Sequence, residues 1–237
     1  MAILEIKNLT KIYGSGHTQV TAVNNVSLEV NAGENVLIMG PSGSGKTTLI
    51  TMTGALLKPT SGNIFINGQN VSQLSEEQLP LIRLQELGFV FQSFNLLGSL
   101  NAQENVAVPL IAAGIKRKEA LLKAKEVLEK LGLTERLKNL PRDLSGGEKQ
   151  RVSIARAIIN NPKIIFADEP TANLDSKTGH EVMDLLCETA CQEKRAVVIV
   201  SHDQRLRDIA HKVLWFEDGK ITKEEAGGHL KNCQYHK

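Results

Sequence analysis

A glycine-rich segment at residues 40–48, GPSGSGKTT, has the residue types and spacing of a phosphate-binding loop. It follows the apolar run NVLIMG and precedes the apolar stretch TTLITMTGALL, so it matches the pattern G-x-x-x-x-G-K-[ST] between a strand and a helix. The backbone N–H groups of such a loop converge on phosphate oxygens. Lys46 supplies a positive charge for the β- and γ-phosphates, and the Thr47 hydroxyl is a ligand for Mg²⁺. The expected binding residues are Gly40, Pro41, Ser42, Gly43, Ser44, Gly45, Lys46, Thr47 and Thr48.

Two neighbouring acids end the apolar segment KIIFADE, residues 163–169. Because ligands bind at the carboxyl ends of strands in parallel sheets, Asp168 is placed to hold Mg²⁺ and Glu169 to orient or deprotonate an attacking water. Gln92 and His202 also end apolar runs, FVFQ and VIVSHD, and so reach the same edge. We expect Gln92 to bridge Mg²⁺ and the water, and His202 to contact the γ-phosphate. These residue types suit phosphate-ester hydrolysis.

Two glycines open the segment LSGGEKQRVSIARA, residues 144–157. Near-helical spacing of its apolar residues predicts a helix from about residue 147 to 160, with Ser145 as the N-cap. Glycine in a helix costs roughly 1 kcal/mol relative to alanine, so Gly146 and Gly147 need a reason. Either an anion approaches a bare helix N-terminus, or a flexible loop precedes an ordinary surface helix. The segment alone favours neither.

The remaining pattern predicts a parallel α/β sheet. Apolar strands alternate with helices, which is typical of that class, and short strands with an Asn67-Gly68 hairpin turn fill the first ninety residues. A helix-rich middle at about residues 93–160 interrupts the strands. We expect a core at residues 1–92 and 161–222, the helical part as an insertion, and a polar tail at residues 223–237. Pro80 is expected to interrupt a helix.

Composition sets weaker limits. The chain has 237 residues, 28 Lys plus Arg and 26 Asp plus Glu, so its formal charge of +2 gives no support for a strongly basic nucleic-acid surface. Three cysteines do not suggest a disulfide framework. Cys187 and Cys191, four residues apart, are expected to be ordinary helix residues, and a metal set of His229, Cys233 and His236 lacks a fourth ligand. No signal-peptide core and no apolar run of about 18 residues is present.

The motifs GPSGSGKT, FVFQ, LSGGEKQR, IIFADE, TANLD and VIVSHD occur in the order of an ABC-transporter ATPase, and the resemblance spans residues 1 to about 222. It implies a P-loop NTPase (RecA-like) core with an N-terminal antiparallel β subdomain and an inserted α-helical subdomain. It also implies that Tyr13 stacks on adenine, that Asp175 lies at a dimer interface, and that Glu169, His202 and Gln92 are catalytic. ATP and Mg²⁺ (Thr47, Gln92, Asp168) are the implied cofactors.

In this family Ser145, Gly146 and Gly147 meet the γ-phosphate of ATP held by the other subunit. The resemblance therefore implies a homodimer in the ATP state, with each chain carrying half of two sites. It also favours the bare helix N-terminus over the flexible loop.

Longer segments around the motifs, such as GSGHTQVTAVNNVSLEV and GFVFQSFNLLGSLNAQENVAVPL, resemble the branch of the family that serves lipoprotein release, macrolide export and heterocyst glycolipid export. This implies an exporter subunit at the cytoplasmic face of the membrane, bound to a separate permease, with a periplasmic adaptor in some members. Phe94, Leu96 and Leu97 are candidates for permease docking or for plain core. The cargo is not specified by this chain.

Three other classes fit less well. A DNA-repair or chromosome-organising ATPase of the superfamily needs a long coiled coil between its motif halves, whereas only about a hundred residues separate Lys46 from Ser145 here. A translation factor of the family carries two cassettes, and one is present. A phosphate-loop kinase has no use for LSGGE, and a guanine-reading N-K-x-D-like motif is missing.

Overall fold

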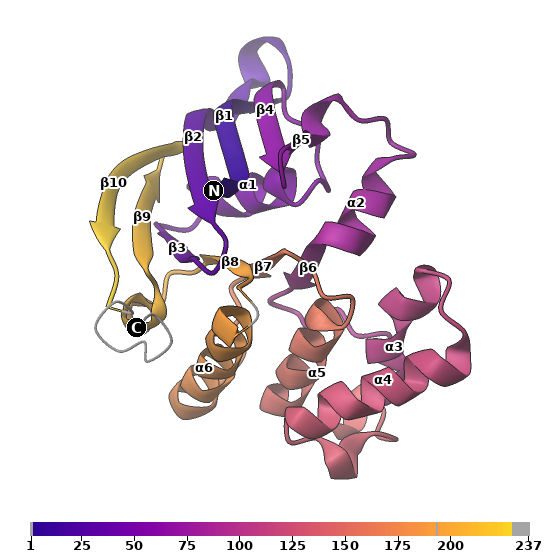
Figure 1. The fold of residues 1–237 in the computed structure, drawn as a ribbon. Helices are drawn as coiled ribbons and strands as arrows, with labels where there is room; N and C mark the ends of the chain where they lie inside the picture. The colour runs from indigo at the N-terminus through magenta and orange to yellow at the C-terminus, as the bar shows by residue number, and fades with distance from the viewer. Residues whose placement is uncertain (1, 193, 229–237) are drawn as a thin grey trace.

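The computed structural model describes residues 2–192 and 194–228 and consists of two sheets with helices packed on them (Figure 1). The smaller sheet is antiparallel, with strand order β2-β1-β4-β5. Alternating apolar residues of β1 and β2 give it one buried face, as expected of a half-exposed sheet. Its strands are β1 (Ala2–Tyr13), β2 (Val20–Asn31), β4 (Ser61–Ile66) and β5 (Gln69–Asn70).

The larger sheet has the order β10-β9-β3-β8-β7-β6, and its pairs from β9 to β6 are parallel. Its central strands are apolar throughout because both faces are covered, which is usual for parallel sheets. The predicted α/β fold with an N-terminal antiparallel sheet is confirmed. The strands are β3 (Asn35–Met39), β6 (Leu87–Val90), β7 (Ile164–Asp168), β8 (Ala196–Val200), β9 (Lys212–Glu217) and β10 (Lys220–Ala226).

Alternation along each central strand divides the apolar core in two. Val36 and Ile38 of β3 face the small sheet and α1, while Leu37 and Met39 face the helices on the other side. Figure 1 shows these helices below the large sheet and the small sheet above it. On the side of the small sheet the helices are α1 (Lys46–Thr53) and α2 (Leu79–Glu86). On the other side they are α3 (Ala102–Ala112), α4 (Arg117–Lys130), α5 (Gly146–Ile158) and α6 (Ser176–Gln192).

Helices α3, α4 and α5 occupy the predicted helical middle, and they join the core of the large sheet. Apolar residues of α3, α4 and α5 belong to the same cluster as Ile165 of β7 and Ile199 of β8. The division at residues 93 and 160 therefore stays a prediction, since no break in the core marks it. Within residues 2–192 and 194–228 there are also short 3₁₀ segments: η1 (Gly16–Thr18), η2 (Val71–Gln73), η3 (Thr134–Arg136), η4 (Pro141–Asp143) and η5 (Gln204–Ile209).

Two local expectations are wrong. Pro80 does not interrupt a helix: it occupies the first turn of α2, where the missing N–H would have no partner. The polar tail does not begin at residue 223, because Lys223 to Ala226 pair with β9 as the end of β10. This edge strand is polar since most of its side chains are not buried, and that polarity made it resemble a tail.

The next features are the cysteines, possible metal ligands and possible membrane-spanning helices. His229, Cys233 and His236, which lack a fourth metal ligand in the sequence, lie outside the described residues, as does the side chain of Cys191. Cys187 is buried in the core. Among the residues that are described, no cluster of three or more His, Cys, Asp or Glu side chains could hold a metal ion. In the same part of the chain no helix has both the length and the apolarity to cross a membrane.

Candidate functional site

The phosphate-type loop runs from β3 into α1, and its glycines are packed against other backbone. A Cβ on Gly40 would overlap the carbonyl of Phe216, and one on Gly45 would overlap the carbonyl of Ala22. Gly45 also has φ 102°, which an L side chain rarely adopts. The structure therefore adds a second reason for these glycines, besides the curl of the loop.

Lys46, at the start of α1, is folded back over this loop. Its Nζ donates hydrogen bonds to the carbonyls of Gly40 and Pro41, both at 2.8 Å. Burial lowers the pKa of the Lys46 ammonium, while the carboxylates of Glu169 and Asp168 act in the opposite direction. The Lys46 ammonium can donate charge-assisted hydrogen bonds to phosphate oxygens. The two carboxylates would repel the same oxygens unless a divalent cation lay between them.

Asp168 ends β7 beside the first turn of α1. The Thr47 hydroxyl donates to Asp168 Oδ1 at 3.4 Å. Burial raises the pKa of Asp168, and the charge of Glu169 raises it further, whereas the Thr47 bond and Lys46 lower it. A divalent cation here would stabilise the ionised carboxylate. Thr47 and Asp168 supply the oxygen ligands that Mg²⁺ prefers, so the donor set fits that ion.

Glu169 is held from two sides by the residues after β8. Ser201 Oγ donates to Glu169 Oε2 at 3.1 Å, and Oε1 lies 3.0 Å from His202 Nδ1. Glu169 has φ 45°, a strained conformation that is frequent at functional sites. Ser201 is fully buried, and the Asp203 amide also donates to its hydroxyl. Sequence reasoning named His202 but missed Ser201, although it stands directly before His202 in VIVSHD.

One cavity of about 580 Å³ collects most of these groups. It brings together predicted residues that follow four strands, β3, β6, β7 and β8, together with Ala22, which the sequence did not indicate. A fixed acid, a neighbouring imidazole and a phosphate-type loop around one space can support hydrolysis of a phosphoanhydride. The lining residues are Ala22, Ser42, Gly43, Gly45, Lys46, Thr47, Thr48, Gln92, Glu169 and His202.

Tyr13 does not line this cavity. It ends β1 with 42% of its surface exposed, and Lys11 Nζ lies 5.3 Å from the centre of its ring. An exposed aromatic ring at a strand end can receive a planar base by stacking. Its expected contact with adenine remains a prediction.

The signature segment, LSGGE at residues 144–148, also lies off the cavity. Ser145 caps α5 through a capping box with Glu148, whose carboxylate pairs with Arg136 Nε at 2.7 Å. That pairing holds the pKa of Glu148 below its usual range. A Cβ on Gly147 would overlap Cγ2 of Thr178 in α6, so this glycine has a packing reason within the chain. The anion-binding reason concerns a partner chain and stays a prediction.

Asp175 caps the start of α6. Its Oδ1 accepts from the backbone amides of Lys177 and Thr178 at 3.2 and 3.1 Å. A hydrogen bond from the Thr178 side chain, followed by these amides, lowers the pKa of Asp175. Nearby, the Asn173 amide donates to the carbonyl of Gln92 at 2.8 Å. The loop before α6 therefore contacts the loop that carries Gln92, and a dimer role for Asp175 remains an expectation.

Two side chains of α5, Gln150 and Arg156, make hydrogen bonds to loops that the sequence did not predict. Gln150 is fully buried and donates to the carbonyl of Pro170 at 2.8 Å. Arg156 donates to the carbonyls of Asn95 and Phe94, at 2.5 and 2.8 Å. Phe94 and Asn95 both have positive φ, 60° and 47°. Helix α5 thus fixes the loop after Gln92, through contacts that no local sequence pattern predicts.

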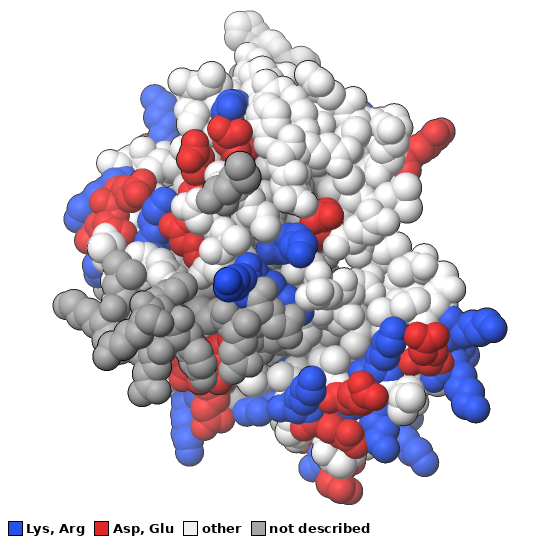
Figure 2. Space-filling view, in the orientation of Figure 1, with Lys and Arg blue, Asp and Glu red and all other residues white. Residues whose placement is uncertain are grey.

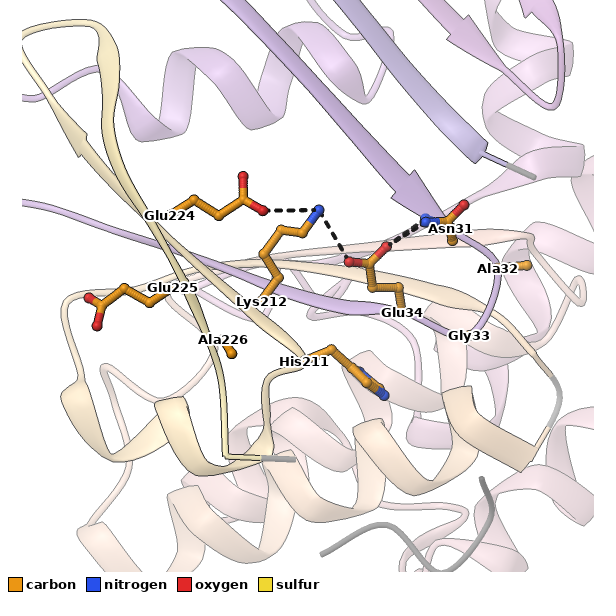
Figure 3. A pocket seen from close by; sticks show the side chains of 9 residues that line it. All are labelled: Asn31, Ala32, Gly33, Glu34, His211, Lys212, Glu224, Glu225 and Ala226. Atoms are coloured by element: carbon orange, nitrogen blue, oxygen red, sulfur yellow. Dashed lines mark hydrogen bonds and ion pairs between the residues drawn. The ribbon is translucent and has the colours of Figure 1, made fainter. Parts of the chain in front are cut away.

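A second hollow, of about 530 Å³, lies between β2, β9 and β10 (Figure 3). Lys212 extends between Glu34 and Glu224, with Nζ–O distances of 3.4 and 3.6 Å. Glu34 also accepts from the Asn31 backbone at 2.8 Å. Since Glu34 and Glu224 balance the charge of Lys212, this hollow is not an anion site. We call these ion pairs the Lys212 clasp, because they join β9 and β10 to the segment that follows β2.

Comparison with known proteins places this geometry among known cassettes. A family model described as "ABC transporter" matches residues 23–172. An uncharacterized ABC transporter ATP-binding protein of Thermotoga maritima is 45% identical over 226 residues, covering 95% of this chain and 96% of that protein. The macrolide export ATP-binding/permease protein MacB of Hyphomonas neptunium is 44% identical over 222 residues, which are 94% of this chain and 34% of MacB.

A solved structure shares the fold. The ATP-binding cassette MJ0796, described as a dimeric post-hydrolysis state bound to ADP and Pi, superposes with a TM-score of 0.87 at 43% identity. The match covers 94% of this chain and 98% of that one. The chain thus spans about a third of the length of its MacB relatives and nearly all of the single cassettes it resembles.

Proposed function

The chain belongs to the ABC transporter family, as an ATP-binding and ATP-hydrolysing cassette, and we propose that it drives a separate membrane permease that exports its cargo. The observation that carries the catalytic part is the convergence of Lys46, Glu169 and His202 on one cavity. The separate permease is inferred from single-cassette relatives of nearly the same length. Export is inferred from the similarity to MacB.

In this proposal the phosphates of ATP lie on the loop of residues 40–48, with Lys46 turned from its loop carbonyls toward the β- and γ-phosphates, and adenine lies on Tyr13. Thr47, Gln92 and Asp168 would hold Mg²⁺, which supplies charge neutralisation for the phosphate oxygens when bound.

Glu169 is the proposed base. A water oxygen attacks the γ-phosphorus, Glu169 accepts the proton that the water releases, and the bond to the bridging β–γ oxygen breaks to give ADP and phosphate. His202 contacts the γ-phosphate, and together with Ser201 it fixes the Glu169 carboxylate. The hydrogen bonds at 3.0 and 3.1 Å support this role, since a base must be held at one position to accept a proton efficiently.

We further propose that two copies form the active unit in the ATP state. Ser145, Gly146 and Gly147 do not line the cavity of their own chain, whereas they open a helix whose positive end favours an anion. A two-fold axis would let the segment of each chain meet the ATP of the other. The dimeric assembly described for MJ0796 supports this arrangement.

A groove between α2, β6 and α3 is the proposed seat of the permease. Its volume is about 370 Å³, and its walls are mainly apolar with the two cations Arg83 and Arg156. Asn95, beside Phe94, lines it, and Leu97 is 49% exposed. Leu96 packs on the core, so of the three predicted docking candidates it fits the core alternative best. Such a partner would place the chain at the cytoplasmic face of the membrane, with a periplasmic adaptor as a further component.

Nucleic acid is not a proposed partner. On the face drawn in Figure 2, the described Lys and Arg residues are interspersed with Asp and Glu, especially over the helices at the lower right. Pairs such as Lys123–Glu119 and Arg117–Glu104 account for part of this mixture. A surface of mixed sign gives little of the electrostatic attraction that phosphate backbones require.

The test is capture of the tagged chain from detergent-solubilised membranes of its source, with two matched variants. Ala112→Glu places a charge on the exposed edge of the groove, and Leu122→Glu places one on an exposed site of α4 outside it. We expect a multi-span permease with a large extracytoplasmic domain, lost with Ala112→Glu and kept with Leu122→Glu. A permease that brings a solute-binding protein would contradict export. Absence of any membrane partner would contradict the transport role and leave the ATPase intact.

A further inference from the structure

The turn between β9 and β10, Asp218–Gly219, is bonded to the phosphate loop. The Gly219 amide donates to the carbonyl of Ser44 at 3.0 Å, and the Gly219 carbonyl accepts from the amide of Asn24 at 2.8 Å. Ser44 belongs to the loop and Asn24 to β2. The two peptide groups that flank this buried glycine therefore link the loop to the small sheet.

Close packing surrounds these two bonds. A Cβ on Gly219 would stand 3.0 Å from the carbonyl oxygen of Ala22 and 3.3 Å from Cα of Val23. A Cβ on Gly45 would lie 3.2 Å from the ring of Phe216, besides overlapping Ala22. The turn, the end of β9 and β2 thus form a closely packed support for the loop, in which an atom added at Gly219 or Gly45 would force its neighbours to shift.

We propose that Gly219 is a positioning residue for the nucleotide. It sets the separation between the phosphate loop and β2, and β2 is paired with β1, which ends in Tyr13. Phosphate and base are bound by different sheets in the proposed function, on which this inference rests. The span between the base and the phosphates of a nucleotide is limited, so a shift in this separation lowers the affinity.

The substitution Gly219→Ala tests the proposal. The new Cβ crowds Ala22, and φ of +76° is unfavourable for alanine, so the turn must shift and release the Ser44 carbonyl. We expect the Kd for MgADP, measured by isothermal titration with the full chain, to rise about fivefold to tenfold, the range expected for one or two weakened hydrogen bonds. Turnover at saturating MgATP should stay within about twofold, because Glu169, Ser201 and His202 lie on other strand ends.

Three matched variants separate positioning from folding. Gly68→Ala introduces the same strain, φ +81°, in the exposed β4–β5 turn, where a Cβ meets nothing within 4 Å. Gly219→Asn tolerates positive φ better than alanine but retains the crowding. Lys212→Met breaks the Lys212 clasp without touching the loop. Thermal unfolding of all four variants records the cost to stability.

The proposal expects weaker MgADP binding in both Gly219 variants and unchanged binding in Gly68→Ala and Lys212→Met. Binding that follows the loss of stability across all four variants would overturn it, as would a Kd in Gly219→Ala equal to that of the unmodified chain. Failure of the unmodified chain to bind MgADP would instead contradict the nucleotide site itself.

Discussion

Gly147 and Thr178 are packed so closely that any side chain on the glycine would overlap the threonine methyl group. Gly147 is the second residue of α5, and Thr178 lies in the first turn of α6, two residues before His180. Packing inside the chain therefore requires a glycine here, separately from the proposed contact with the phosphate of a partner's ATP.

A pair of variants separates these reasons. We expect Gly147→Ala to lower the free energy of unfolding by about 1–3 kcal/mol, the usual cost of overpacking, and to abolish the ATP-dependent dimer. Thr178→Ser removes the methyl group but keeps the hydroxyl near Asp175. The double variant should regain stability, measured by thermal unfolding, without regaining the dimer, measured by light scattering. A double variant that dimerises normally would show that packing is the whole explanation.

Removal of the proposed base should separate binding from hydrolysis. Glu169→Gln keeps the hydrogen bond from Ser201 but cannot accept a proton, so ATP turnover should fall at least about a hundredfold. ATP that is not consumed should hold two copies together, visible by size-exclusion chromatography in saturating MgATP. Glu126→Gln, at an exposed site on α4, serves as the control and should behave as the unmodified chain. A monomeric Glu169→Gln profile would count against the composite site.

Ser201 is expected to act through Glu169. Ser201→Ala removes the 3.1 Å bond to Glu169 Oε2 and leaves the Asp203 amide without its acceptor. We expect kcat to fall about tenfold while KM for ATP changes little, since Ser201 does not line the cavity. Ser201→Thr, which keeps the hydroxyl, should recover part of kcat. An equal loss with Ala and Thr would assign the effect to packing.

Because the pKa of Asp168 is raised, replacing this residue with a neutral one should increase the stability of the protein, by an amount that depends on pH. Burial and the charge of Glu169 disfavour the ionised carboxylate, so the native state binds this proton more tightly than the unfolded chain does. Ionisation therefore costs stability as pH rises above the ordinary carboxyl pKa of about 4. Asp168→Asn should raise Tm by on the order of 2 °C near pH 7.5 in a metal-chelating buffer, and not at pH 4.

The control for this prediction is Mg²⁺ with ADP. Because the ion would bind the ionised carboxylate, the ligand should stabilise the unmodified chain more than Asp168→Asn. If the difference in Tm is the same at pH 4 and 7.5, ionisation of Asp168 is not its cause.

Much of the fold follows from local patterns. Apolar runs ending in polar residues placed β7 and β8 with the correct ends, and the predicted helix-rich middle at about residues 93–160 contains α3, α4 and α5. Gln92 was expected at the end of a strand, yet β6 ends two residues earlier, at Val90. The order of motifs brought most of the expected residues to one cavity because each follows a strand of the same parallel sheet.

The contacts that tighten the site could not be predicted in this way. Arg156 and Gln150 look like ordinary helix residues, and only the packing of α5 on the loops reveals the carbonyls they bind. Ser201 is a polar residue beside a named histidine, whose role depends on the strained turn at Glu169. The Gly219 support depends on residues about 175 positions apart, which no sequence window includes.

The strand order of the large sheet has a consequence for synthesis of the protein. β3, which leads into the phosphate loop, lies between β8 and β9. It is the first strand of this sheet to be synthesised, but both strands that pair with it are synthesised late. Helices α3 and α4 pack on each other and can form early during translation, whereas pairing across such separations is slow. We therefore expect a ribosome-bound chain that ends before residue 196 to lack the strands that flank β3, and with them an ordered phosphate loop.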